Sequence, residues 1–111
     1  MKKLSILFIL FLISICSYSQ RVFKTYIKNE ANVSVYVVNS EDLADLKVFD
    51  TQKRIQSKGN KGVWYFEDRE KRAKKKVFFT DNINQSDIKI IFVDKKRKAG
   101  WLNNNKKHLF Y

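Results

Sequence analysis

A 13-residue repeat is the feature that most limits how this chain can fold. The repeat is marked by pairs of apolar residues, namely Val22-Phe23, Val35-Tyr36, Val48-Phe49, Trp64-Tyr65, Val77-Phe78 and Ile90-Ile91. The two halves of the chain come into phase when three extra residues are allowed in segment 58–62, whose two glycines indicate a loop. Because a fixed period indicates that one structural unit is used many times, we predict six strand-and-turn units.

The apolar positions predict an all-β fold, because β-branched and aromatic side chains suit a pleated surface. Each apolar run lasts about four to six residues, the usual length of a strand. The runs 35–38 and 63–66 are apolar throughout, which is typical of strands that are covered on both faces. A small domain has no spare layer of helices, so we predict that the repeats wind around and cover one another.

Two other folds stay open on this sequence. Segment 67–76 contains good helix formers, although it has no apolar stripe that a helix would bury. A parallel β-solenoid would also give a fixed period, but solenoid coils are usually longer and richer in glycine or asparagine. We therefore favour the wound all-β domain over both.

The first 19 residues have the pattern of a secretory signal peptide. Lys2 and Lys3 precede an apolar run over 4–15, which is too short to span a bilayer as a helix. Ser17 and Ser19 then supply the small side chains that a signal peptidase accepts before Gln20. We predict a signal peptide over 1–19 and a single domain over 20–111. The protein is then periplasmic or secreted, with no transmembrane segment after cleavage.

Cys16 offers the alternative of a lipoprotein, but Ile15 before it is larger than lipoprotein processing favours. Cleavage after Ser19 removes this cysteine, the only one in the sequence, so the mature domain has no disulfide and no thiolate ligand. The remaining 92 residues hold 21 basic and 11 acidic side chains, a net charge of +10. The many aromatic residues exclude a disordered basic tail, so we expect a folded monomer without a cofactor.

The repeat resembles that of the septoil-knot family, small bacterial domains of unknown function. The resemblance lies in stretches 35–44, 45–49 and 87–94, and in the ending Gly100-Trp101 followed by 106–111. It extends from about residue 22 to residue 111 and implies a β-rich chain wound into a torus knot with seven crossings. The chain departs from the family in its connections, which are basic here where the family has acidic and tyrosine-rich ones.

Positive charge is the clearest candidate for a functional feature. Two basic clusters lie at similar positions of two repeats and comprise Lys74, Lys75, Lys76, Lys95, Lys96, Arg97 and Lys98. Since repeats place equivalent residues on equivalent surfaces, we expect one basic stripe that attracts anionic polymers or lipid headgroups. The alternative is a solvated face that only keeps the protein soluble.

Nucleic acid is a weaker candidate partner, because single-strand binders place exposed aromatic side chains beside their cations. Most aromatic residues here occupy strand positions, and we expect only Tyr26, Trp101 and Phe110 to be exposed. The sequence therefore favours an anionic envelope component, or a partner protein, over nucleic acid.

Metal binding and catalysis receive little support. A polar column recurs with the repeat at Asn39, Gln52, Asp68, Asp81 and Asp94. Calcium would need several oxygen ligands close together, so we expect these side chains to bond their own backbone in turns. His108, the one histidine, has no partner that the sequence identifies as a general base. We predict a non-enzymatic interaction domain; the alternatives are a purely structural module without a ligand and an enzyme whose site is assembled across repeats.

Overall fold

The computed structural model describes residues 19–111, so the predicted signal peptide lies almost entirely outside the described residues. The strands are β1 (Arg21–Lys24), β2 (Val33–Val37), β3 (Leu46–Asp50), β4 (Val63–Phe66), β5 (Lys75–Phe79), β6 (Ile88–Phe92) and β7 (Gly100–Trp101). Each apolar pair of the repeat lies in one of β1 to β6, which confirms the predicted all-β fold and its six units. The two-residue strand β7 was not predicted.

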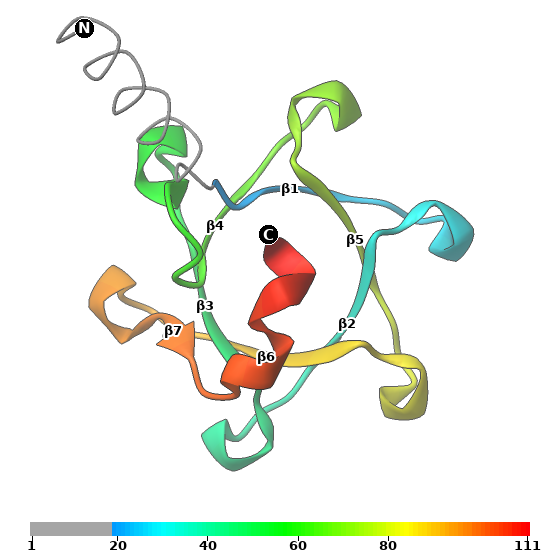
Figure 1. Ribbon diagram of the computed structural model, residues 1–111, viewed down its shortest axis with the longest axis vertical. Coiled ribbons are helices and arrows are strands. Elements are labelled where there is room, and N and C mark those ends of the chain that lie inside the picture. The colour runs from blue at the N-terminus through cyan, green and yellow to red at the C-terminus, as the bar shows by residue number, and fades with distance from the viewer. Residues whose placement is uncertain (1–18) are drawn as a thin grey trace, which may run out of the picture.

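Strands β1 to β6 form a closed barrel in the order β4-β1-β5-β2-β6-β3, and β3 pairs back to β4. All pairings around the barrel are parallel, whereas β7 adds to the start of β3 in antiparallel fashion. The chain passes around the barrel twice, and β4, β5 and β6 each lie between two strands of the first passage (Figure 1). The repeats therefore wind on one another as predicted, while the seven-crossing knot stays a prediction.

The alternative solenoid is wrong, because a solenoid stacks its repeats in sequence order. Here β3 and β4 are the only strands consecutive in sequence that pair in parallel within residues 19–111. The helix considered for segment 67–76 is also wrong. That segment holds one 3-10 turn and the start of β5, since β5 completes the barrel wall and buries Val77.

A short 3-10 turn follows each of the first six strands and forms a corner outside the barrel (Figure 1). The turns are η1 (Lys28–Glu30), η2 (Glu41–Leu43), η3 (Arg54–Ser57), η4 (Glu70–Arg72), η5 (Ile83–Gln85) and η6 (Lys96–Lys98). Around the rim they follow the order η4, η1, η5, η2, η6, η3. Corners that are consecutive in sequence are thus mostly separated in space by a corner from the other passage.

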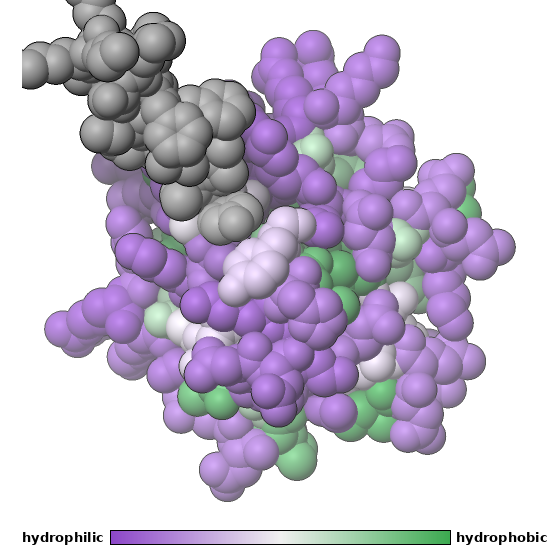
Figure 2. Space-filling model, in the orientation of Figure 1, coloured by the Kyte–Doolittle hydropathy of each residue, from purple (hydrophilic) through white to green (hydrophobic). Residues whose placement is uncertain are grey.

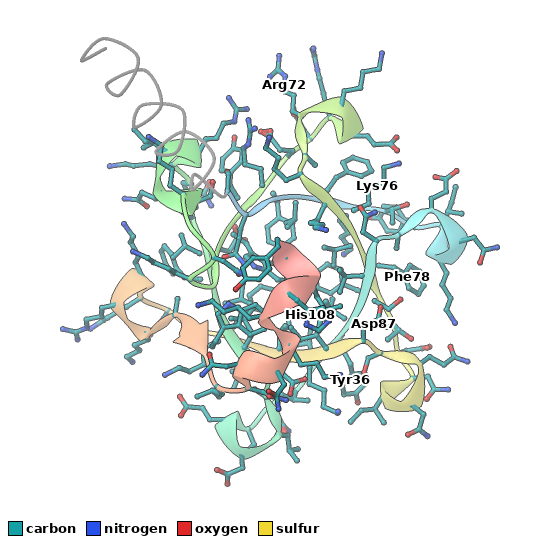
Figure 3. The ribbon with its side chains drawn as sticks, in the orientation of Figure 1. Tyr36, Arg72, Lys76, Phe78, Asp87 and His108 are labelled. Atoms are coloured by element: carbon teal, nitrogen blue, oxygen red, sulfur yellow. The ribbon has the colours of Figure 1, made fainter. Side chains whose placement is uncertain are left out.

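The core fills the inside of the barrel. Its buried residues are Val22, Val33, Val35, Leu46, Val48, Trp64, Val77, Ile88, Ile90 and Phe110. On the outer side of the wall, Tyr36, Phe49 and Phe78 are only partly buried (Figure 3 shows Tyr36 and Phe78). The predicted cover on both faces is therefore complete inside the barrel and partial outside.

The C-terminal 3-10 segment η7 (Asn104–Phe110) closes one end of the barrel (Figure 1). Phe110 is only 3% exposed, and its ring centroid lies 5.1 Å from that of Trp64 and 6.1 Å from that of Trp101. The expectation of exposure is wrong for Phe110, and Trp101 is only partly exposed, because the open end of a barrel needs an apolar plug to which both rings contribute. Tyr26 is exposed as expected.

A hydrogen-bonded cluster joins the start of the barrel, segment 58–62 and η7. Gln20 is buried, and its side chain donates to Asn60 Oδ1 at 2.7 Å and accepts from the Gly62 N–H at 2.8 Å. Asn60 donates in turn to the Lys107 carbonyl at 2.9 Å and accepts from the Trp101 indole at 3.0 Å. The predicted loop is therefore the point at which the barrel closes and the tail is fastened.

Candidate anion-binding surface

The six corner connections divide into two groups by charge. Three neighbouring corners, η6, η3 and η4, carry connections 93–99, 51–62 and 67–74, which hold twelve basic and four acidic side chains. We call these three connections the basic arc. The other three corners, η1, η5 and η2, carry connections 25–32, 80–87 and 38–45, which hold one basic and six acidic side chains. We call these the acidic arc.

The interleaving of the two passages produces this separation. The η1 connection, which has one acidic and one basic side chain, and the acidic η2 connection come from the first passage, and the acidic η5 connection comes from the second but falls between them. In the same way η3 falls between η4 and η6. The charge of the domain is therefore concentrated on one side of the rim, where it produces a stronger local potential than an even distribution would.

A pocket of about 470 Å³ opens within the basic arc. Its lining residues are Ser19, Arg21, Arg54, Ile55, Lys58 and Lys74, and we call it the cationic pocket. They come from the start of β1, from the η3 corner and from the residue that enters β5. Four basic side chains from three separate parts of the sequence thus line one cavity.

Arg54 is held in place by a carboxylate behind it. Its Nε and Nη2 donate to the two carboxylate oxygens of Glu67 at 2.7 and 3.2 Å, and the Glu67 side chain is fully buried. The guanidinium also lies over the Tyr65 ring, 5.1 Å from the centroid. The hydrogen bond to Glu67 raises the pKa of Arg54, and the paired donors to one carboxylate fix the orientation of the guanidinium.

The other three cations of the pocket have no carboxylate partner among residues 19–111. The Nε of Arg21 is buried there without a hydrogen-bond partner, while Lys58 and Lys74 are exposed and form no ion pair with a described residue. A buried donor without a partner costs about 1–3 kcal/mol relative to a satisfied one. An oxyanion in this pocket would meet the exposed ammonium groups of Lys58 and Lys74, which no described carboxylate neutralises.

The first predicted basic cluster is divided by the structure. Lys74 lines the cationic pocket, whereas Lys75 and Lys76 lie in β5 and are partly buried. Lys76 forms an ion pair with Glu70, and the hydrogen bond between them raises the pKa of Lys76. Arg72 on the neighbouring η4 corner points away from the barrel (Figure 3).

The second predicted cluster lies at the η6 corner. Lys95, Lys96, Arg97 and Lys98 are all exposed there, and Lys98 pairs with Asp94 at 3.2 Å. The two clusters do not meet directly, because the η3 corner lies between them (Figure 1). The predicted stripe is instead an arc, completed by residues that sequence reasoning missed: Arg21, Arg54 and Lys58. The available signal was segment 51–62, which contains four basic and no acidic side chains.

The side chains of the recurring polar column, which starts at Asn39, do not make the hydrogen bonds that hold the turns. Thr25, Thr51 and Thr80, each one residue earlier in its repeat, accept hydrogen bonds from the backbone N–H two residues ahead at 3.1–3.2 Å. Within residues 19–111, no group of three or more histidine, cysteine or acidic side chains gathers in a way that could hold a metal ion. His108 is exposed on η7 (Figure 3). That the domain is not an enzyme stays a prediction.

An apolar hollow lies on the opposite side of the rim. It measures about 320 Å³ and is lined by Tyr36, Val37, Val38, Asn39, Leu43 and Ile83, which belong to the end of β2 and to the η2 and η5 corners. We call it the apolar groove. Figure 2 shows a mostly hydrophilic face with small hydrophobic areas over these two corners. The groove therefore opens within the acidic arc.

These observations define a class of protein: a closed parallel β-barrel made of interleaved repeats, with a rim of opposite charges. The chain belongs to the family of the 7(1) septoil knot domain, which it matches over residues 19–102. The match confirms the family resemblance and ends before η7, so it does not include 106–111. No curated protein and no solved structure gives a significant match. No helix within residues 19–111 has the length and apolar character needed to cross a membrane.

Proposed function

We propose that this septoil-knot domain is an exported, non-enzymatic interaction module that binds an acidic polymer of the cell envelope through the basic arc. The observation that carries the proposal is the convergence of Arg21, Lys58 and Lys74, all without a carboxylate partner in the described chain, beside the fixed guanidinium of Arg54. The groups recognised there are phosphate, sulfate or carboxylate oxyanions, which arginine binds through paired donors.

The size of the pocket supports a polymer unit over a free ion. A volume of about 470 Å³ lies in the range of sites for organic ligands and exceeds what a single oxyanion fills. Ile55, which is 68% exposed, adds an apolar wall to the pocket. The remaining cations of the basic arc would then contact neighbouring units of the same polymer.

The experiment compares salt-dependent retention on heparin with binding to vesicles that contain anionic lipid. The pocket variant is Arg21→Gln/Lys58→Gln/Lys74→Gln; Arg54 is left unchanged because its loss would orphan the buried Glu67. The control variant is Lys28→Gln/Lys47→Gln/Lys89→Gln, which removes the same charge outside the basic arc.

We expect the exported wild-type chain to bind heparin and to be released as salt rises, because the attraction is screened and counterions are released. The pocket variant should bind at least about tenfold more weakly, since the loss of even one hydrogen bond to a charged group costs about 1.5–3 kcal/mol. The control variant should lose much less. Equal losses in both variants, or no salt-sensitive binding at all, would leave a purely structural module as the better explanation. Preference for vesicles over heparin would identify lipid phosphate as the ligand.

A further inference from the structure

The apolar groove and the η3 corner have complementary surfaces. The groove exposes Val37, Leu43 and Ile83, whose side chains are 44%, 54% and 38% exposed. On the basic arc, Ile55 is 68% exposed at η3 between Arg54 and Lys58. One surface is thus an apolar hollow within acidic connections, and the other is an apolar side chain within basic connections.

We propose that a second copy of this chain is the occupant of the apolar groove, with Ile55 of one copy inserted into the groove of the next. The opposite charges of the two arcs favour a second copy of this chain as the occupant. The acidic arc around the groove has six acidic side chains against one basic, and the basic arc around Ile55 has twelve basic against four acidic. Opposite potentials on two meeting surfaces favour association and fix its orientation.

The net positive charge of the whole chain does not forbid this contact. At about 0.1 M salt the Debye length is about 10 Å, so the charges close to the contact dominate over those on the far side of the barrel. The contact joins an acidic and a basic surface, and the basic arc of the second copy lies on the far side of its own barrel from the contact. We therefore expect weak association near this ionic strength and its loss in high salt.

The positions of the two surfaces decide the form of the assembly. The corners follow one another as η4, η1, η5, η2, η6 and η3, so η3 and η5 lie on opposite sides of the rim (Figure 1). A contact between two different surfaces of the same chain is heterologous, and it continues from copy to copy unless a rotation closes a ring. Opposite placement favours a row of copies over a closed pair, in place of the monomer expected from the sequence.

The test uses two variants that each retain one surface. Ile55→Glu removes the inserted side chain and leaves the groove intact, whereas Leu43→Lys blocks the groove and leaves Ile55 intact. Both side chains are more than half exposed, so both variants should fold and melt like the wild type. Ile27→Glu is the matched control, since Ile27 is 54% exposed and lies outside both surfaces.

Sedimentation equilibrium at about 0.1 M salt then gives the average mass as the protein concentration is raised. We expect the mass of the wild type and of Ile27→Glu to rise continuously, and each surface variant alone to stay at the monomer mass. An equal mixture of Ile55→Glu and Leu43→Lys should reach twice the monomer mass and rise no further. The Ile55 side chain of the Leu43→Lys variant can enter the intact groove of the Ile55→Glu variant, and no second contact can form. A wild type that stays monomeric at millimolar concentration, or a mixture of folded variants that does, would overturn the proposal. No polyanion is present, so the result is independent of the proposed function.

Discussion

The basic and acidic arcs have the same backbone structure but opposite charge. Comparing them separates the interactions that hold the fold from the side chains that the fold exposes on its surface. On the acidic arc, Thr25 and Thr80 are buried and hold the turn through the N–H two residues ahead. Thr51 on the basic arc does the same. Each connection of both arcs contains a 3-10 turn and leads to a strand of the same sheet. The turn geometry therefore does not dictate the charge of a corner.

Since the backbone accepts either charge, the separation into two arcs is a property of the surface and not a requirement of the barrel. A solvated surface that served only solubility would be free to mix both signs at every corner. Here one side of the rim is basic and holds a pocket, and the other is acidic and holds a groove. If the arcs share one core and differ only in what they bind, a core substitution affects both arcs alike and a surface substitution affects one.

The largest effect is expected from the shared core. Ile90 is fully buried inside the barrel, and Ile90→Ala should lower the free energy of unfolding by about 2–5 kcal/mol because it leaves a cavity. Urea unfolding followed by the fluorescence of buried Trp64 measures this change. Ile83→Ala on the acidic arc should change stability by less than about 0.5 kcal/mol. If hydrogen exchange showed that Ile90→Ala destabilises one arc but not the other, the two arcs would not share one core.

The next largest loss of stability is expected at Gly62, where the barrel closes beside the basic arc. Gly62 and Gly59 both have φ of +82°, but a side chain on Gly62 would collide with the Lys47 carbonyl, whereas Gly59 faces only the flexible Lys61 side chain. Both substitutions by alanine strain the backbone, which costs about 1–3 kcal/mol. We expect Gly62→Ala to be clearly the more destabilising in urea unfolding. Equal losses would mean that conformation alone, and not close packing against β3, requires glycine there.

A smaller effect is expected at the η6 corner, at the edge of the basic arc. The triple variant Lys95→Gln/Lys96→Gln/Arg97→Gln removes three exposed cations that do not line the cationic pocket. Exposed ion pairs contribute about 0.2–1 kcal/mol each, so the loss of three should lower heparin affinity at least about threefold, but by less than in the pocket variant. Isothermal titration at one fixed salt concentration compares the two variants. A larger loss here would move the binding site from the pocket to the η6 corner.

The smallest effect on stability is expected at Asp50, which directly precedes connection 51–62 of the basic arc. Burial raises the pKa of its carboxyl above the ordinary value of 3.8. The folded chain therefore binds this proton more tightly than the unfolded chain, and stability falls as the pH rises through the two pKa values. Asp50→Asn should raise stability at pH 7 by no more than about 0.5 kcal/mol and change nothing at pH 2. Thermal unfolding at both pH values measures the difference. A loss at pH 7 would show that the basic arc stabilises this carboxylate after all.

The sequence by itself determined where the strands lie and that the strands must bury one another. Val35, Val48 and Val77 lie in strands as predicted, because β-branched side chains at a fixed spacing suit only a repeated strand. The winding of the repeats also followed from the sequence, since apolar strands in a small domain must be buried by other strands. The resemblance to the septoil-knot family pointed to the same fold.

Only the tertiary structure decided which corners are neighbours. The strand order interleaves two passages of the chain, and that order brings Arg21, Arg54 and Lys74 to one pocket from three parts of the sequence. It likewise placed Phe110 in the barrel end, although its position outside the predicted strands suggested exposure. A local pattern records which side chains prefer burial. The partners that bury them, and the charges that meet on the rim, depend on pairings between residues far apart in the chain.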